Sequence, residues 1–157
     1  MKKVHFIGIG GIGVSALAKF YFKKGWQVSG SDLEESEITK DLEKLGAQIF
    51  IGKHKASNFP RDVNLVIYSS AVSPKNPELK KAYKLQTTRQ RRGSSEAANY
   101  KLQIKSYPQA LGQLTKKYFT IAISGTHGKS TTSAFISLIL IRAGLDPTVI
   151  LGTKLRE

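Results

Sequence analysis

Short strand-like runs and helix-like periodic segments alternate along the first half of the chain. Each strand-like run is bounded by turn-forming residues, and between the runs apolar positions recur every three or four residues, as on the inner face of a helix. The predicted strands are residues 4–7, 27–30, 48–51 and 63–68, and the predicted helices are residues 12–24, 35–45 and one that opens at Asn76 with Pro77 in its first turn. Strands that alternate with helices predict an α/β fold, with a Rossmann-like parallel sheet and helices on both faces.

The alternation of predicted strands and helices is interrupted after residue 86. Residues 87–99 are polar and lack a period, so we interpret them as an exposed insertion. Further elements are predicted after it: strands near 102–105, over 118–123 and over 148–151, and helices over 109–117 and 129–143. The helix over 129–143 is apolar nearly all round, which is typical of a helix in the interior of a larger domain.

The composition indicates a folded globular protein, since 40% of the 157 residues are hydrophobic. No apolar stretch reaches the roughly 20 residues that span a bilayer. The chain opens on Met1-Lys2-Lys3 and runs straight into a strand-like segment, so we expect no signal peptide and a cytoplasmic location. The absence of cysteine excludes disulfides, cysteine-ligated zinc and thiol catalysis.

The formal charge of +14 is high for this length. It is compatible with nucleic acid, an anionic surface or phosphorylated small ligands as partners. Arg89, Arg91 and Arg92 form the one tight basic cluster, for which a solvated loop is the plainer explanation. Because the chain has no recognisable nucleic-acid motif, we expect neither nucleic acid nor a membrane as its partner.

A first glycine-rich loop follows the first predicted strand and precedes a predicted helix. Its pattern, glycine at positions 8, 10 and 13, is that of dinucleotide-binding loops. Gly8 would permit the tight turn, Gly10 the approach of a pyrophosphate, and Gly13 the packing of the helix on the strand. Asp32 ends the second strand, where a carboxylate can accept hydrogen bonds from a ribose. The pattern leaves NAD and UDP-sugars open as ligands, and a purely structural strand–helix turn as well.

A second glycine-rich loop, residues 125–132, has different chemistry. It departs from the usual Walker spacing, because Ile123 stands where a glycine is expected. Its backbone amides can form an anion nest, and Lys129 can neutralise the β- and γ-phosphates of a nucleotide. A hydroxyl from Ser130 or Thr131 can bind Mg²⁺. Two loops of different kinds predict two phosphorylated ligands on one molecule, as a transfer or ligation reaction requires.

The three histidines form no metal-ligand cluster in the sequence. His5 lies inside the first predicted strand, where a core or rim residue with satisfied hydrogen bonds is expected. His54 lies in a charged loop and is expected to be solvated. His127 can contact a phosphate or face solvent.

The motifs together resemble a known family. Residues 5–13, 29–32, 69–72 and 76–78 resemble, in order, the N-terminal domain of the Mur ligases, and residues 125–132 are similar to that family's ATP loop. The resemblance implies an ATP- and Mg²⁺-dependent ligase of peptidoglycan synthesis, which joins L-alanine to UDP-N-acetylmuramate through an acyl phosphate.

The resemblance also implies which residues bind each ligand. The UDP part would be held by Gly8, Gly10, Gly11, Ile12, Gly13, Asp32, Ser69, Ser70 and Ala71. ATP would be held by Gly125, Thr126, His127, Gly128, Lys129, Ser130 and Thr131. Lys129 would be the catalytic residue, and the Ser130 hydroxyl would bind Mg²⁺.

We therefore expect residues 1–107 to form the UDP-substrate-binding domain and residues 108–157 to begin a P-loop-type α/β ATPase domain. The family has a complete central domain and a C-terminal domain, so the chain is expected to lack the alanine site and to show no ligase turnover alone. Two alternatives remain at this point: an NAD(H)-binding Rossmann domain, and a UDP-sugar-binding module without catalysis.

Overall fold

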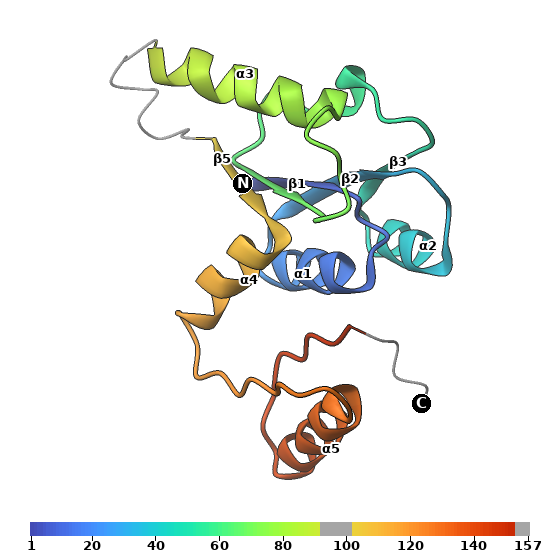
Figure 1. The fold of residues 1–157 in the computed structure, drawn as a ribbon, viewed down its shortest axis with the longest axis vertical. Coiled ribbons are helices and arrows are strands. Elements are labelled where there is room, and N and C mark those ends of the chain that lie inside the picture. The colour runs from blue at the N-terminus through green and yellow to red at the C-terminus, as the bar shows by residue number, and fades with distance from the viewer. Residues whose placement is uncertain (92–101, 153–157) are drawn as a thin grey trace.

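Five parallel strands form a single sheet at the centre of the structure, a computed structural model that describes residues 1–91 and 102–152 (Figure 1). The strands are β1 (Lys3–Ile7), β2 (Gln27–Asp32), β3 (Gln48–Ile51), β4 (Leu65–Tyr68) and β5 (Gln103–Ser106). They lie in the order β3-β2-β1-β4-β5, and every neighbouring pair is parallel. The predicted parallel sheet is thus confirmed.

Helices cover both faces of this sheet. They are α1 (Ile12–Lys23), α2 (Glu37–Lys44), α3 (Pro77–Arg91) and α4 (Tyr107–Thr115), with a short 3₁₀ helix, η1 (Ala56–Asn58), and α5 (Lys129–Arg142) further along. In Figure 1, α3 lies on one side of the sheet and α1, α2 and α4 lie on the other. The predicted α/β fold with two covered faces is therefore confirmed.

Alternation along the strands builds a separate core on each face, because successive side chains of a strand point to opposite sides. Val4 and Phe6 of β1 are fully buried in the cluster that α1, α2 and α4 cover. Ile7 belongs instead to the cluster beneath α3 and η1, together with Phe59 and Leu79.

The strand order reverses direction at β1. The chain moves outward from β1 through β2 to β3, and then returns to place β4 on the other side of β1. In doubly wound sheets, ligands bind at the carboxyl ends of the strands at such a switch point. The loops that follow β1 and β4 therefore lie side by side at the edge where a ligand is expected.

The N-terminus of α3 follows the prediction and its C-terminus does not. The side-chain oxygen of Asn76 accepts hydrogen bonds from the backbone amides of Glu78 (2.9 Å) and Leu79 (3.1 Å), as a helix cap does. The helix continues through residues 87–91, into the segment predicted to be an irregular insertion. Residues 92–99 of that segment lie outside the described residues.

The helix α4 packs on the sheet. It contacts α1, β4 and β5, and Ala110 is buried in the same core as β1. The predicted domain boundary after residue 107 thus falls inside an element that belongs to the first packed body.

Two predicted strands are wrong. Residues 118–123 and 148–151 have no strand conformation, and Phe119 is 96% exposed. A strand exists through hydrogen bonds to a neighbouring strand, and no described segment pairs with either of them. The apolar, β-branched sequences of these two segments favour the strand conformation, but neither segment has a neighbouring strand to pair with among the described residues.

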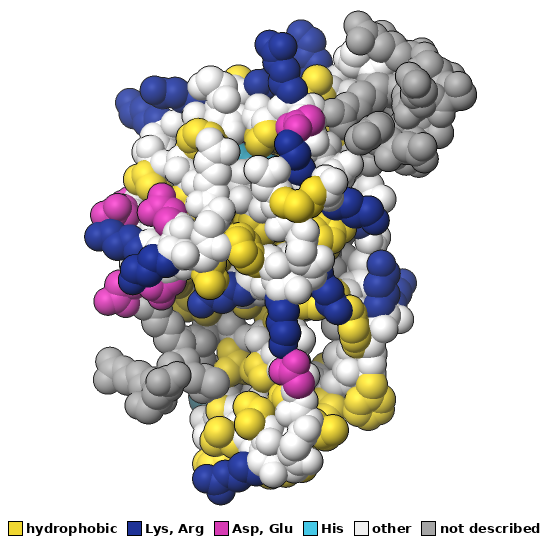
Figure 2. Space-filling view, turned by 180° about the vertical axis from the view of Figure 1, so that it is seen from behind, with side chains coloured by type: hydrophobic (Ala, Val, Ile, Leu, Met, Phe, Trp, Pro, Cys, Tyr) yellow, Lys and Arg dark blue, Asp and Glu magenta, His cyan; other side chains and the backbone are white. Residues whose placement is uncertain are grey.

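The predicted last helix is confirmed as α5, and many of its apolar side chains are exposed. Phe135 and Ile139 are 63% and 66% exposed. Figure 2 shows hydrophobic side chains gathered at this lower end of the molecule. Among the described helices, none is both long and apolar enough to cross a membrane.

The close packing of β2 against the first glycine loop gives a stability prediction. A Cβ at Gly30 would lie 2.6 Å from Ile9 Cδ1 and 2.8 Å from the Phe6 carbonyl oxygen. We expect Gly30→Ala to lower the free energy of unfolding by about 1–3 kcal/mol through overpacking, measured by urea denaturation. Gly112→Ala is the matched control, because nothing lies within 4 Å of its Cβ position. Equal stability of the two variants would contradict this packing.

Candidate functional site

The loop after β1 is held by backbone groups of β2. The amides of Gly8 and Ile9 both donate to the carbonyl oxygen of Ser31, at 2.8 and 3.1 Å. The next residue of β2 continues the contact, since the Gly10 amide donates to Asp32 Oδ2 at 2.7 Å. The end of β2 therefore fixes the shape of the loop that leads into α1.

The first two glycines of this loop are required by neighbouring polar side chains. Gly8 has φ +79°, and a Cβ there would lie 2.9 Å from Ser69 Cβ, in the loop after β4. A Cβ at Gly10 would lie 2.9 Å from Asp32 Oδ2. The tight turn predicted at Gly8 is confirmed, and its cause includes close contact with a second loop at the same edge.

The third glycine has a different neighbour from the predicted one. A Cβ at Gly13 would lie 2.5 Å from the hydroxyl oxygen of Tyr107, the first residue of α4. The closest approach to Gly13 is therefore made by a tyrosine of α4, which was not predicted. A Cβ at Gly11 would lie no closer than 3.6 Å to any described atom outside its chain neighbours. No steric contact among the described residues therefore requires a glycine at this position.

The loop after β4 completes the carboxyl edge. The Ser69 amide donates to the carbonyl oxygen of Ile7 at 2.9 Å, and the Ala71 amide donates to Ser69 Oγ at 3.3 Å. Ser70 and Ala71 are exposed. The structure thus brings together the three segments predicted to bind the UDP part, namely residues 8–13, Asp32 and residues 69–71.

The helices that follow the two glycine loops lack side-chain caps. Ser36 caps α2 and Asn76 caps α3, whereas α1 and α5 begin after Gly11 and Gly128 with no side-chain cap and no acidic residue in the first turn. Uncapped amides and the positive end of the helix dipole favour an anion at both helix starts.

The second loop is exposed, and the side chain of Lys129 folds back onto the backbone of the loop. Gly125 and Gly128 have φ of +147° and +75°, and Gly128 is the N-cap of α5. The ammonium group of Lys129 donates to the carbonyl oxygens of Gly125 (2.5 Å) and Thr126 (3.2 Å). His127 is exposed in the same loop. The predicted ATP-binding residues thus form one local loop, and no hydrogen bond or ion pair joins it to the first loop in the described part of the chain.

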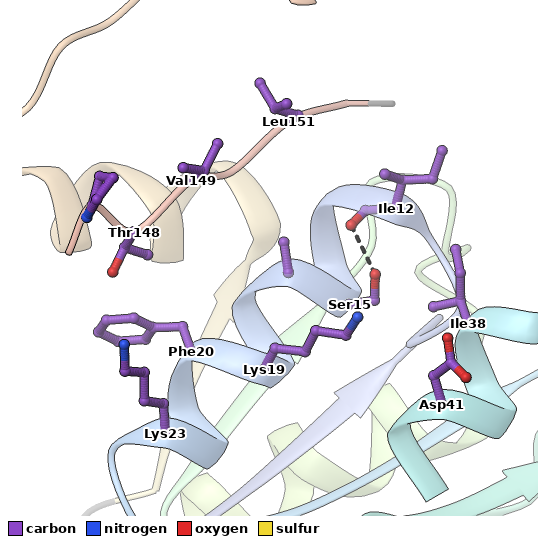
Figure 3. A pocket seen from close by; sticks show the side chains of 12 residues that line it. Ile12, Ser15, Lys19, Phe20, Lys23, Ile38, Asp41, Thr148, Val149 and Leu151 are labelled. Carbon is purple, nitrogen blue, oxygen red and sulfur yellow. Dashed lines mark hydrogen bonds between the residues drawn. The ribbon is translucent and has the colours of Figure 1, made fainter. Parts of the chain in front are cut away.

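A cavity of about 540 Å³ lies along the outer face of α1 (Figure 3). It is bounded by α1, α2 and residues 147–151, and Figure 3 shows Val149 and Leu151 across the opening from Ile12. An ion pair between Lys23 and Asp146 (2.7 Å) joins the two walls at one end. Of the residues predicted to bind ligands, Ile12 alone lines this cavity.

A buried polar cluster beneath the first loop was not predicted. Its centre is Glu78, which is fully buried and accepts three hydrogen bonds. Ser31 Oγ donates to its Oε2 at 2.8 Å, His5 Nε2 lies 3.0 Å from the same oxygen, and His54 Nδ1 lies 2.9 Å from Oε1. We assign to each histidine the tautomer that donates, since a carboxylate only accepts.

The outcome differs for the two histidines of the cluster. His5 is a fully buried core residue with both ring nitrogens bonded, the second one to Ser29 Oγ at 2.9 Å, so its prediction is confirmed. The solvated position predicted for His54 is wrong, because its side chain is only 13% exposed and contacts Glu78 and Ser31. An acidic residue in the first turn of a helix is common, so nothing in the sequence marked Glu78 as the centre of a cluster.

The cluster supports the first loop through Ser31. The carbonyl oxygen of this residue holds the loop amides, and its hydroxyl binds Glu78. Burial raises the pKa of Glu78, but hydrogen bonds from His5, His54 and Ser31 outweigh it, so the pKa lies below its ordinary value of 4.5. The carboxylate is therefore charged at neutral pH and satisfied by its three donors.

Comparison with known proteins agrees with this geometry. Residues 3–95 match the family model described as Mur ligase family, catalytic domain. The chain belongs to the Mur ligase family.

Individual relatives extend the similarity to the rest of the chain. It is 44% identical to the UDP-N-acetylmuramate–L-alanine ligase of Aquifex aeolicus over 157 residues, which are all of this chain and 31% of that protein. The crystal structure of the UDP-N-acetylmuramate–alanine ligase of Thermotoga maritima superimposes with a TM-score of 0.73 and 36% identity, over 92% of this chain and 30% of that one. A murein peptide ligase of Psychrobacter arcticus has a TM-score of 0.72 and 27% identity, over 92% of this chain and 27% of that one. The chain thus spans 27–31% of the length of these relatives.

Substitution of the buried carboxylate tests the cluster. Glu78→Gln places an amide NH₂ among three donors and leaves at least one of them without an acceptor. We expect the free energy of unfolding to fall by about 3 kcal/mol, measured by urea denaturation at neutral pH. Glu43→Gln, on the exposed face of α2, is the control and should leave stability unchanged. A loss no greater than that of the control would show that the cluster contributes little.

The lowered pKa of Glu78 predicts a pH dependence of stability. A carboxyl whose pKa is depressed by folding stabilises the protein above its unfolded pKa, and this contribution is lost as the pH falls through the folded pKa. The wild type should therefore lose stability as the pH falls below about 4.5, and Glu78→Gln should lose less over the same range. Parallel stability curves for the two proteins would contradict the assignment.

Proposed function

We propose that this chain carries the UDP-substrate site and the ATP loop of a ligase that joins L-alanine to UDP-N-acetylmuramate, a cytoplasmic step of peptidoglycan synthesis. The observation that carries the proposal is the convergence of residues 8–13, Asp32 and residues 69–71 on the uncapped start of α1. Family membership and the 44% identity to an L-alanine ligase support this choice of reaction.

The first loop supplies the diphosphate site in this proposal. The free amides at the start of α1 point toward the ligand, and the helix dipole favours its negative charge. Gly10 allows the backbone to approach, and Asp32 accepts hydrogen bonds from the ribose. Ser69, Ser70 and Ala71 form the opposite wall.

The second loop supplies the ATP site. Lys129 already lies over the loop, bound to two carbonyl oxygens, so a nucleotide phosphate offers its ammonium group a stronger partner. The hydroxyl of Ser130, one residue into α5, suits Mg²⁺, which prefers oxygen ligands. ATP would transfer its γ-phosphoryl group to the lactyl carboxylate, and the amino group of L-alanine would then displace phosphate from the acyl phosphate.

The division of the chain follows the packing. We propose that the UDP-substrate domain extends from residue 1 to the end of α4, a few residues beyond the boundary expected from the sequence, and that the following residues begin the ATP-binding domain. The exposed apolar residues of α5, such as Phe135 and Ile139, support this division because they suit the interior of a larger domain.

Binding of the nucleotide sugar tests the proposal directly. We expect calorimetric titration of the chain to show binding of UDP-N-acetylmuramate and at least roughly tenfold weaker binding of NADH. Gly10→Ala should weaken binding of the UDP ligand, because the added Cβ would lie 2.9 Å from Asp32 Oδ2 and would disturb the loop. Gly112→Ala serves again as the control. Preferential binding of NADH would favour a nicotinamide-binding domain instead.

The second loop can be tested by itself. Lys129→Ala removes the cation that faces the phosphates, so Mg·ATP affinity should fall by on the order of tenfold or more while UDP-N-acetylmuramate affinity stays unchanged. Lys116→Ala, another exposed lysine, is the matched control. Loss of both ligands in the Lys129 variant would contradict two separate sites.

A further inference from the structure

Tyr107 stands at the same edge of the sheet as the first glycine loop. It follows Ser106, the last residue of β5, and begins α4. Its hydroxyl oxygen and Cζ lie 2.5 and 2.7 Å from the position of a Cβ on Gly13. The hydroxyl end of the ring therefore rests directly on the first turn of α1.

The hydroxyl lies toward the free end of α1. Cα–Cβ bonds in a helix tilt toward the N-terminus, so a group that occupies the Cβ position of Gly13 lies on the N-terminal side of that residue. On that side are the uncapped amides of α1, where the proposed function places a diphosphate.

The core holds the ring of Tyr107 in place, and among the described residues its hydroxyl has no hydrogen-bond acceptor. The half-buried ring packs against the core cluster that includes Val14 and Ala110. The Tyr107 hydroxyl makes no hydrogen bond with any residue in the described part of the chain. Burial raises the pKa of Tyr107, so the phenol keeps its proton at neutral pH.

We propose that Tyr107 is a further binding residue of the first loop, whose hydroxyl donates a hydrogen bond to a phosphate oxygen of the bound nucleotide diphosphate. The proposal rests on the proposed function of that loop. It also explains Gly13 physically, because any larger residue there would displace the donor from the anion.

Removal of the hydroxyl alone is the experiment. Tyr107→Phe keeps the ring on Gly13, so the unfolding temperature should be unchanged. We expect UDP affinity, measured by calorimetry, to fall roughly tenfold, as for the loss of one hydrogen bond to a charged group. Uridine, measured by NMR titration, lacks the phosphates and should bind the variant and the wild type equally. Tyr83→Phe, on α3 across the sheet, is the control for loss of a tyrosine hydroxyl.

The possible outcomes distinguish a failure of the Tyr107 assignment from a failure of the proposed function. If the wild type binds UDP and the Tyr107 variant binds it equally well, the assignment of Tyr107 is wrong and the proposed function stands. Equal weakening of UDP and uridine would show a purely structural role and would also overturn the assignment. If the wild type does not bind UDP, the proposed function and this assignment both fail.

Discussion

Three glycines on one loop each leave room for a polar side chain from a different element, and the site depends on this steric constraint. Ser69 comes from the loop after β4, Asp32 from the end of β2, and Tyr107 from the start of α4. Parallel strands direct all three to one edge of the sheet, since their carboxyl ends meet there. Without Cβ atoms at these three positions, the polar side chains can approach the start of α1 closely, at the edge where the proposed function places the nucleotide.

Ser31 couples the packing of the core to the shape of the first loop. The carbonyl oxygen of this residue holds two loop amides, while its hydroxyl belongs to the cluster around Glu78. The cluster joins β1 and β2 to the start of α3 and to the loop that carries His54. A buried charge that is satisfied by three donors is rigid, because loss of any donor leaves it short of a partner. The loop thus inherits its fixed shape from the core beneath α3.

Local features were predictable from the sequence, and features that join distant residues were not. The glycine loop, the Asn76 cap and the strand over residues 4–7 all depend on neighbours a few residues apart. The contact of Gly13 with Tyr107 and that of His54 with Glu78 join residues far apart in the chain, and only the folded topology brings them together. The strand predicted over 118–123 failed for the same reason, since its propensity is local but its hydrogen-bond partner is not.

The central claim is that the two glycine loops serve two different phosphorylated ligands, a UDP-sugar at the first and ATP at the second. The most direct test is an amide NMR titration of the chain with UDP-N-acetylmuramate and then with Mg·ATP. The account predicts that the UDP ligand shifts the amides of residues 10–13, residues 69–71 and Tyr107, and that Mg·ATP shifts those of residues 125–131. Shifts at residues 125–131 with the UDP ligand, and none at residues 10–13, would contradict it.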